Sequence, residues 1–237
     1  MRYSSFILII AVMKKSTFDF APALVEFEGG VVRINFDVES VMQEFPSMGG
    51  EETEQREVFL ANVVRVPHPL TVETISEQLV KEGFDEYKAA EVANEVILNL
   101  VQQGLATGDE LALAKAMVIA KIEQYDKSDA VNEFTLNGNP MWIPRELRNE
   151  LLDRVNREIE RGHSILPVDY NGTPIPLPCA EGKPMIEQLK YYADDCYTKT
   201  AEHKIAVNAL SNVEQVLAYD YTVGYPPKLS FTISIAE

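Results

Sequence analysis

Residues 134–177 read FTLNGNPMWIPRELRNELLDRVNREIERGHSILPVDYNGTPIPL, and this stretch decides the fold class. Asn137-Gly138 and Asn171-Gly172 each separate two short apolar runs, and Asn-Gly favours a two-residue hairpin turn because both turn positions need positive φ. Between the hairpins, Pro144 is typical of the first position of a helix and Gly162 of its end. Five apolar residues of this helix are predicted to face inward: Leu147, Leu151, Leu152, Val155 and Ile159. A hairpin, a helix and a second hairpin in succession predict an α+β fold.

The residues that follow predict one long helix and a closing strand. Pro184 is expected to open a helix that runs to residue 210, with inward-facing residues spaced alternately three and four apart. These residues are Ile186, Leu189, Ala193, Cys196, Thr200, His203, Val207 and Leu210. A seam of period 3.5 suits packing along another helix, either the 145–161 helix of the same chain or a copy of the seam in another subunit. Residues 211–214 would cap a short helix, and residues 228–235 would close the chain as a strand.

Strand patterns occupy the N-terminal quarter of the chain. Residues 22–36 alternate apolar and polar side chains around Gly29-Gly30, which supplies the positive φ of a tight turn and predicts a further hairpin. Residues 46–56 are polar and are predicted to form a loop. Residues 58–66 are largely apolar and are interpreted as a further strand that ends at Pro67.

From residue 71 the hydrophobic period becomes helical. Thr71 is predicted to cap a helix that ends at Gly83, and Asp85 a helix that ends at Gly104. Residues 107–110 read Thr-Gly-Asp-Glu and predict a capping box for a third helix, whose buried face would comprise Leu113, Ala116, Met117 and Ala120. The pattern divides the chain into three parts: a strand and hairpin region over 1–66, a helical unit over 67–130 and an α+β domain over 131–237.

The charge balance restricts the partners that the chain can bind. Its 237 residues include 21 Lys and Arg against 37 Asp and Glu, for a formal net charge of −16 at pH 7. Nucleic-acid affinity comes mainly from cations that displace counterions from phosphates, so DNA or RNA binding is not expected. Anionic membrane surfaces are disfavoured for the same reason.

Two further features of the sequence point to an ordinary cytoplasmic chain. The apolar run at residues 6–13 is far shorter than the ~20 residues that span a bilayer; it is interpreted as an edge strand, or as an extension upstream of a natural start at Met13. Cys179 and Cys196 are too few for a disulfide framework and are predicted to be reduced thiols.

His203 is the most conspicuous candidate for chemistry. It lies in the long predicted helix, where Asp194 and Asp195 precede it by nine and eight residues, which places them roughly 12 Å away along the helix axis. That separation is too long for a shared metal or an acid–base pair, so His203 is predicted to be buried and bonded to a hydroxyl or a backbone carbonyl. No catalytic, cofactor-binding or metal-ligating residue is therefore predicted.

The tail at residues 219–227 reads Tyr-Asp-Tyr-Thr-Val-Gly-Tyr-Pro-Pro and allows two interpretations. Exposed aromatic side chains beside a rigid turn form good recognition surfaces, which makes Tyr219, Tyr221 and Tyr225, together with Trp142, the predicted partner-binding residues. Alternatively, the tyrosines cover the corner between the last helix and the last strand.

Several of these features together resemble a known domain. They are the helix with Arg145, Leu147 and Arg154; the hairpin at 168–172; residues 192–197 (Tyr-Ala-Asp-Asp-Cys-Tyr); Thr200 with His203-Lys204; and the tail at 219–226. The pattern resembles a domain of unknown function from phage and prophage tail-fibre and tail-fibre-assembly proteins, most closely the versions in Bacteroides prophages. The resemblance covers residues 134–237 and extends loosely to residues 56–62.

The resemblance implies a non-enzymatic structural protein of a virion, associated with a tail or fibre, that docks onto other phage structural proteins. It allows a homo-oligomer and places the chain in the virion, or in the host cytoplasm during assembly. Two alternatives stay open: an assembly chaperone that leaves before maturation, and an enzyme that acts on glycans through a pair of carboxylates. No catalytic residue carries over from the resemblance.

Overall fold

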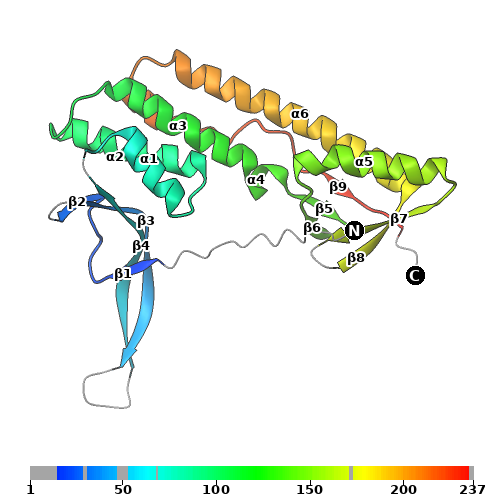
Figure 1. Ribbon diagram of the computed structural model, residues 1–237, viewed down its shortest axis with the longest axis horizontal. Helices are drawn as coiled ribbons and strands as arrows, with labels where there is room; N and C mark the ends of the chain where they lie inside the picture. The colour runs from blue at the N-terminus through cyan, green and yellow to red at the C-terminus, as the bar shows by residue number, and fades with distance from the viewer. Residues whose placement is uncertain (1–14, 29–30, 47–52, 68, 171–172, 235–237) are drawn as a thin grey trace. The chain divides into compact units, whose positions relative to one another are not determined.

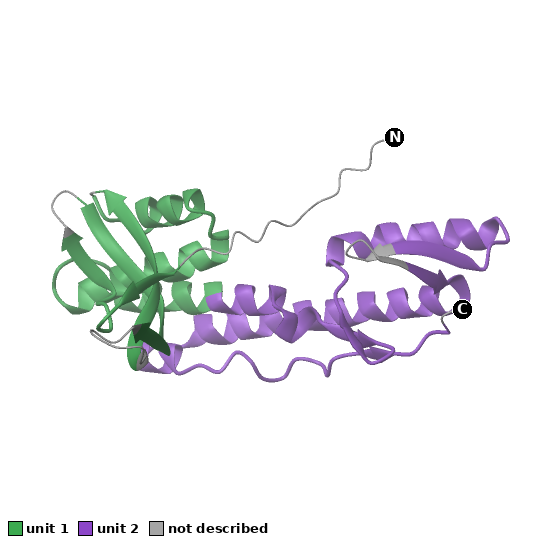
Figure 2. Ribbon diagram, turned by 90° about the horizontal axis from the view of Figure 1, so that it is seen from below, with its two compact units in different colours: residues 1–120 green, residues 121–237 purple. Residues whose placement is uncertain are grey.

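A computed structural model describes residues 15–28, 31–46, 53–67, 69–170 and 173–234. The chain forms two compact units, residues 1–120 and 121–237 (Figure 2). The boundary between the units falls within helix α3 (Glu110–Lys127). Helices and small, mostly antiparallel sheets alternate along the chain, so the predicted α+β class is correct.

Unit 1 contains a four-stranded antiparallel sheet in the order β1-β4-β3-β2 (Figure 1). Its strands are β1 (Ser16–Phe18), β2 (Val25–Glu28), β3 (Val31–Pro46) and β4 (Thr53–Pro67). Glu28 pairs with Val31, which confirms the predicted hairpin, although its two glycines lie outside the described residues. The predicted loop at 46–56 is too long, because the β3–β4 ladder continues to the pair Pro46 and Thr53.

Helices α1 (Val72–Lys81) and α2 (Glu86–Gln102) begin where the sequence predicts. Thr71 and Asp85 accept hydrogen bonds from first-turn amides, which confirms both caps. The third cap was placed wrongly: α3 begins at Glu110, and Asp109 rather than Thr107 accepts a hydrogen bond, from the amide of Ala112.

The buried face of α3 also differs by a small rotation from the predicted one. Ala116 is exposed, whereas Ala114, Met117 and Val118 are buried. The inward stripe of α3 therefore includes Ala114 and Val118 beside the predicted Met117 and Ala120.

One core joins the sheet of unit 1 to its helices. Side chains of β3 and β4 pack against α1 and α2 in a single cluster that includes Val32, Ile34, Phe36, Val64, Val66, Ile75, Leu79, Val92 and Val96. The predicted division near residue 66 is therefore not a domain boundary, because neither the strands nor the helices have a separate core. A β-bulge follows Phe36, and Asp37 adopts a positive φ of 50° there.

The described part of unit 2 contains two small sheets, two long helices and two short ones, besides the end of α3. One sheet has the order β6-β5-β9, from β5 (Phe134–Leu136), β6 (Asn139–Met141) and β9 (Ser230–Phe231); the other is the hairpin of β7 (Ile165–Tyr170) and β8 (Thr173–Pro178). The helices are α4 (Asp129–Asn132), α5 (Arg145–Glu160), α6 (Cys179–Ala209) and α7 (Val213–Leu217). Both predicted Asn-Gly hairpins are confirmed by their strand registers.

Four expectations for unit 2 are wrong in detail. Pro144 is the N-cap of α5 rather than its first residue. Leu147 and Ile159 are 51% and 43% exposed, and the buried residues of the helix are Arg148, Leu151 and Val155. Helix α6 starts at Cys179 rather than at Pro184, since the Cys179 amide donates to Ser164 O and the chain passes directly from the hairpin into the helix. Strand β9 spans only two residues.

The predicted seam of α6 is buried within the chain except at Ala193 and Leu210, which are half-buried. Ile186 and Leu189 pack in a core with Leu151 and Val155 of α5, which supports the intrachain interpretation of this part of the seam. In the described ranges, no helix combines the length and apolar character that a bilayer crossing requires.

The β7–β8 hairpin presents an edge that cannot accept another strand. Pro167 is paired with Pro176, and neither residue has an N–H to donate, so the ladder hydrogen bonds must fall on the alternate pairs. The nitrogens of Pro174, Pro176 and Pro178 therefore lie along the outer edge of β8, which leaves that edge without donors there.

Candidate functional site

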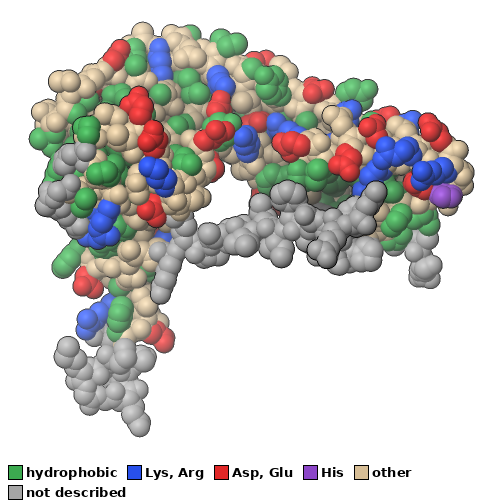
Figure 3. Space-filling view, viewed as in Figure 1, with side chains coloured by type: hydrophobic (Ala, Val, Ile, Leu, Met, Phe, Trp, Pro, Cys, Tyr) green, Lys and Arg blue, Asp and Glu red, His purple; other side chains and the backbone are tan. Residues whose placement is uncertain are grey.

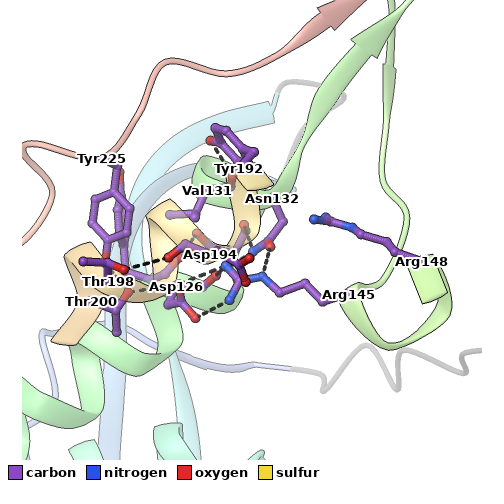
Figure 4. Close-up of polar contacts among 12 residues, drawn as sticks. Asp126, Val131, Asn132, Arg145, Arg148, Tyr192, Asp194, Thr198, Thr200 and Tyr225 are labelled. Carbon is purple, nitrogen blue, oxygen red and sulfur yellow. Dashed lines mark hydrogen bonds and ion pairs between the residues drawn. The ribbon is translucent and has the colours of Figure 1, made fainter. Parts of the chain in front are cut away.

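A group of buried and half-buried polar side chains lies within unit 2, where the end of α3, the start of α5, the middle of α6 and the C-terminal tail meet (Figure 4). We call this group the polar cluster; its members are Asp126, Asn132, Arg145, Thr200 and Tyr225.

Asp126 is the centre of the polar cluster and is only 8% exposed. Arg145 binds it with two parallel bonds, from Nη1 to Oδ2 and from Nη2 to Oδ1, each 2.9 Å long. The remaining guanidinium donor, Nε, binds Asn132 Oδ1 at 2.9 Å, and the amide of Asn132 donates to Asp126 O at 2.6 Å. This arrangement fixes the planar guanidinium, because all three of its nitrogens are engaged.

The tail reaches Asp126 through a hydroxyl relay. Thr200 Oγ1 donates to Asp126 Oδ1 at 2.9 Å and also lies 2.9 Å from the Tyr225 hydroxyl. Since the threonine proton is directed at the carboxylate, Tyr225 is the donor in the second bond. Burial raises the pKa of Tyr225, which keeps the phenol protonated and able to donate.

His203 attaches the same tail one turn further along α6. Its Nε2 lies 2.9 Å from Val223 O, so this nitrogen carries the proton, and Nδ1 accepts from the Tyr219 hydroxyl at 2.7 Å. The ring also stacks on Tyr225. The prediction of a buried histidine bonded to a hydroxyl or a backbone carbonyl is confirmed, and the structure shows both partners. Asp194 and Asp195 are exposed and take no part in these bonds.

Arg148 is a buried cation beside the polar cluster that the sequence analysis missed. Its side chain is 2% exposed; Nε donates to Ile143 O at 3.0 Å and Nη1 to Leu189 O at 2.6 Å. Burial, and then the charge of Arg145, lower the pKa of Arg148. Its spacing of three and seven residues from Leu151 and Val155 places it on the buried stripe of α5, and this signal could have identified it.

The predicted partner-binding residues are partly occupied inside the chain. The hydroxyls of Tyr219 and Tyr225 are bonded as described, and Tyr221 packs edge-on against Tyr125 with ring centres 5.8 Å apart. The structure thus brings the three tyrosines together against α6 and the end of α3. Trp142 lies between β6 and α5 and is half-buried. Tyr219 and Tyr225 therefore use their hydroxyls to hold the tail within the chain.

An open polar groove lies between α6 and the tail. It is lined by Asp195, Thr198, Lys199, Glu202, Gly224 and Pro226 and has a volume of about 310 Å³. Both carboxylates are exposed, and Glu202 is paired with Lys199 at 3.1 Å. A glycosidase acid is kept protonated by a sheltered, apolar environment, which this groove does not provide.

The two cysteine thiols are not activated as nucleophiles. Cys179 and Cys196 are buried free thiols, and burial raises the pKa of both, which opposes formation of the reactive thiolate. Across the described ranges, no three His, Cys, Asp or Glu side chains gather as metal ligands would. The small pocket at the unit 2 core encloses about 30 Å³ and is lined by apolar residues alone: Leu136, Met141, Ile143, Leu151, Val168, Ile175, Leu177 and Met185.

Comparison of the chain with protein-family models, with curated proteins and with solved structures gives no match. The role of the polar cluster and His203 is therefore inferred from their geometry. Their hydrogen bonds hold the tail against α6, and the groups that form these bonds are already paired within the chain.

Proposed function

We propose that this chain is a non-enzymatic structural protein of a tailed phage or prophage, associated with the tail or a fibre, that acts by docking onto other phage structural proteins. The observation that carries the docking function is the long ribbon formed by β3 and β4 in unit 1. We define the ribbon as residues 39–46 and 53–58.

The ribbon consists of two strands without further described neighbours. Strand β2 pairs only with residues 31–34 of β3, and β1 only with residues 59–61 of β4, so the ribbon extends beyond both (Figure 1). Two-stranded ribbons are marginally stable alone in water, and exposed strand edges are usually shortened or blocked. A ribbon of this length is well suited to a partner that completes it.

Two further observations agree with a docking role. The polar cluster and His203 are engaged in bonds within the chain, which favours an architectural use of these groups over a catalytic one. The face shown in Figure 3 has carboxylates and cations interspersed over its helices, as on surfaces that select partners by charge. The tail-fibre resemblance supplies the phage assignment.

The location of the chain tests this proposal. A host carrying the gene with a short C-terminal epitope tag is induced, and particles are purified by density gradient and analysed by quantitative mass spectrometry. A structural role gives a fixed copy number per particle that persists after a high-salt wash. Recovery only in the particle-free lysate, bound to a fibre precursor, would support the chaperone alternative, and recovery in neither fraction would overturn a phage role.

A further inference from the structure

We infer that the free edge of the ribbon accepts an extended basic segment of another protein, which pairs with β3 at residues 39–45 as an added strand. This inference rests on the proposed docking function and specifies the chemistry of the partner. The segment would carry Lys or Arg beside an aliphatic side chain on the face described below.

The edge of β3 is open to backbone pairing. Residues 39–45 bond to β4 on one side, and on the other side no described strand is paired with them. This stretch contains no proline, in contrast to β8, where every second residue from Pro174 to Pro178 is a proline. The chain therefore blocks one sheet edge and leaves another available, and strand addition satisfies the open backbone groups of such an edge.

One face of the ribbon is acidic around a methionine. Met42 is paired with Glu57, and Glu44 with Gln55, so these side chains share a face with Ser40. Met42 is 63% exposed, and Glu57 accepts a hydrogen bond from Ser40. Arg56, the cation of the ribbon, is paired with Gln43 and projects from the opposite face.

This face favours a basic partner over a second copy of the chain. A flexible thioether adapts to aliphatic side chains, and the carboxylates at positions 44 and 57 attract cations placed on either side of it. Two copies of a chain with a formal net charge of −16 would repel each other at this acidic face. Charge complementarity therefore selects a different protein with an alternating basic and apolar segment.

The test uses the full chain and a fluorescent ten-residue peptide of alternating Lys and Val. A peptide of the same length with alternating Glu and Val is the control. We expect anisotropy to show binding of the Lys/Val peptide alone, weakened about tenfold between 50 and 300 mM NaCl. Hydrogen exchange should show new protection of backbone amides within residues 39–45.

Two double charge reversals distinguish binding to the acidic face of the ribbon from attraction to the net charge of the chain. Glu44→Lys with Glu57→Lys should weaken the Lys/Val peptide at least tenfold, whereas Glu150→Lys with Glu160→Lys, the same charge change on the exposed face of α5, should leave binding within twofold. Equal loss in both variants, equal binding of the Glu/Val peptide, or binding without protection at residues 39–45 would each overturn the inference. So would light scattering that shows a dimer abolished by the ribbon reversals. Absence of the chain from particles would remove the phage assignment without changing any of these binding results.

Discussion

Arg145 links the start of α5 to the end of α3 through the carboxylate of Asp126 and the amide of Asn132. Loss of one partner from a fully buried ion pair costs about 3–5 kcal/mol, and the Arg145 side chain is still 26% exposed. We therefore expect Arg145→Ala to lower the free energy of unfolding by about 2–3 kcal/mol. Arg145→Lys should recover part of this loss, because it restores the charge without the two parallel bonds.

Urea unfolding followed by circular dichroism measures this loss. Arg157→Ala is the matched control, since Arg157 is exposed on the same helix and surface changes usually stay within about 0.5 kcal/mol. Equal effects of the two alanine variants would show that the bonds of Arg145 contribute nothing to the stability of unit 2.

The two buried thiols give a pH dependence with a definite sign. Burial raises the pKa of Cys179 and Cys196 above the ordinary value of 9.0. The native state therefore keeps these protons at pH values where the unfolded chain has lost them, so stability is full below pH 9 and falls as pH rises above it. We expect the urea midpoint to be flat from pH 7 to 8 and to decline between pH 9 and 10.5.

The double variant Cys179→Ala and Cys196→Ala isolates the thiol contribution. Its midpoint will be lower throughout because of the lost packing, but it should fall less steeply above pH 9 than that of the natural chain. Tyr192 and Tyr225, whose pKa values are also raised mainly by burial, supply a further decline that persists in the double variant. Identical slopes in the two proteins would contradict the assignment to the thiols.

At the scale of elements, the close approach of α6 to β8 depends on one glycine. A Cβ added at Gly182 would lie 2.6 Å from Cγ of Leu177, and Leu177 is itself buried in the core of unit 2. Because overpacking a core costs typically about 1–3 kcal/mol, we expect Gly182→Ala to destabilise the chain by about 1–2 kcal/mol despite the better helix propensity of alanine. Thermal unfolding by calorimetry measures the effect.

Gln188→Ala is the control for this substitution, as an exposed position of the same helix. A second variant, Gly182→Ala with Leu177→Ala, tests the cause. If contact with Leu177 is the reason, the combined variant should lose less than the sum of the two single losses. Strict additivity would assign the Gly182 effect to something other than this contact.

Elements whose ends depend on local bonds were predictable from the sequence. Thr71 and Asp85 cap α1 and α2 with their own side chains, and Asn137-Gly138 sets a hairpin register between adjacent residues. The start of α6 was not predictable from the position of Pro184, because it depends on the bond from Cys179 to Ser164, across the whole β7–β8 hairpin.

The same distinction applies to the candidate site. Burial of His203 followed from its place in the seam of α6, but its partners Tyr219 and Val223 lie on a segment without a regular period. The bonds from Asp126 to Arg145 and to Thr200 join residues 19 and 74 positions apart. No spacing rule in the sequence indicates such contacts. The sequence therefore could not predict that these residues bind one another.

At the scale of the whole molecule, net charge sets the response to salt. The chain has a formal net charge of −16 at pH 7 and an isoelectric point near 4.6, so self-repulsion opposes compaction at neutral pH. Salt relieves this repulsion but also weakens attractive ion pairs. The pairs Lys88–Glu91 and Arg145–Asp126 are partly buried and therefore screened less than exposed charges.

Exposed pairs such as Lys199–Glu202 contribute about 0–1 kcal/mol each, which is too little to reverse the relief of self-repulsion. We therefore expect the urea midpoint at pH 7.5 to rise between 20 and 300 mM NaCl. Near pH 4.8 the net charge is close to zero and the attractive pairs dominate, so the same salt increase should leave the midpoint unchanged or lower it. A midpoint that falls with salt at pH 7.5 would mean that specific ion pairs, and not net repulsion, control the electrostatic stability of the chain.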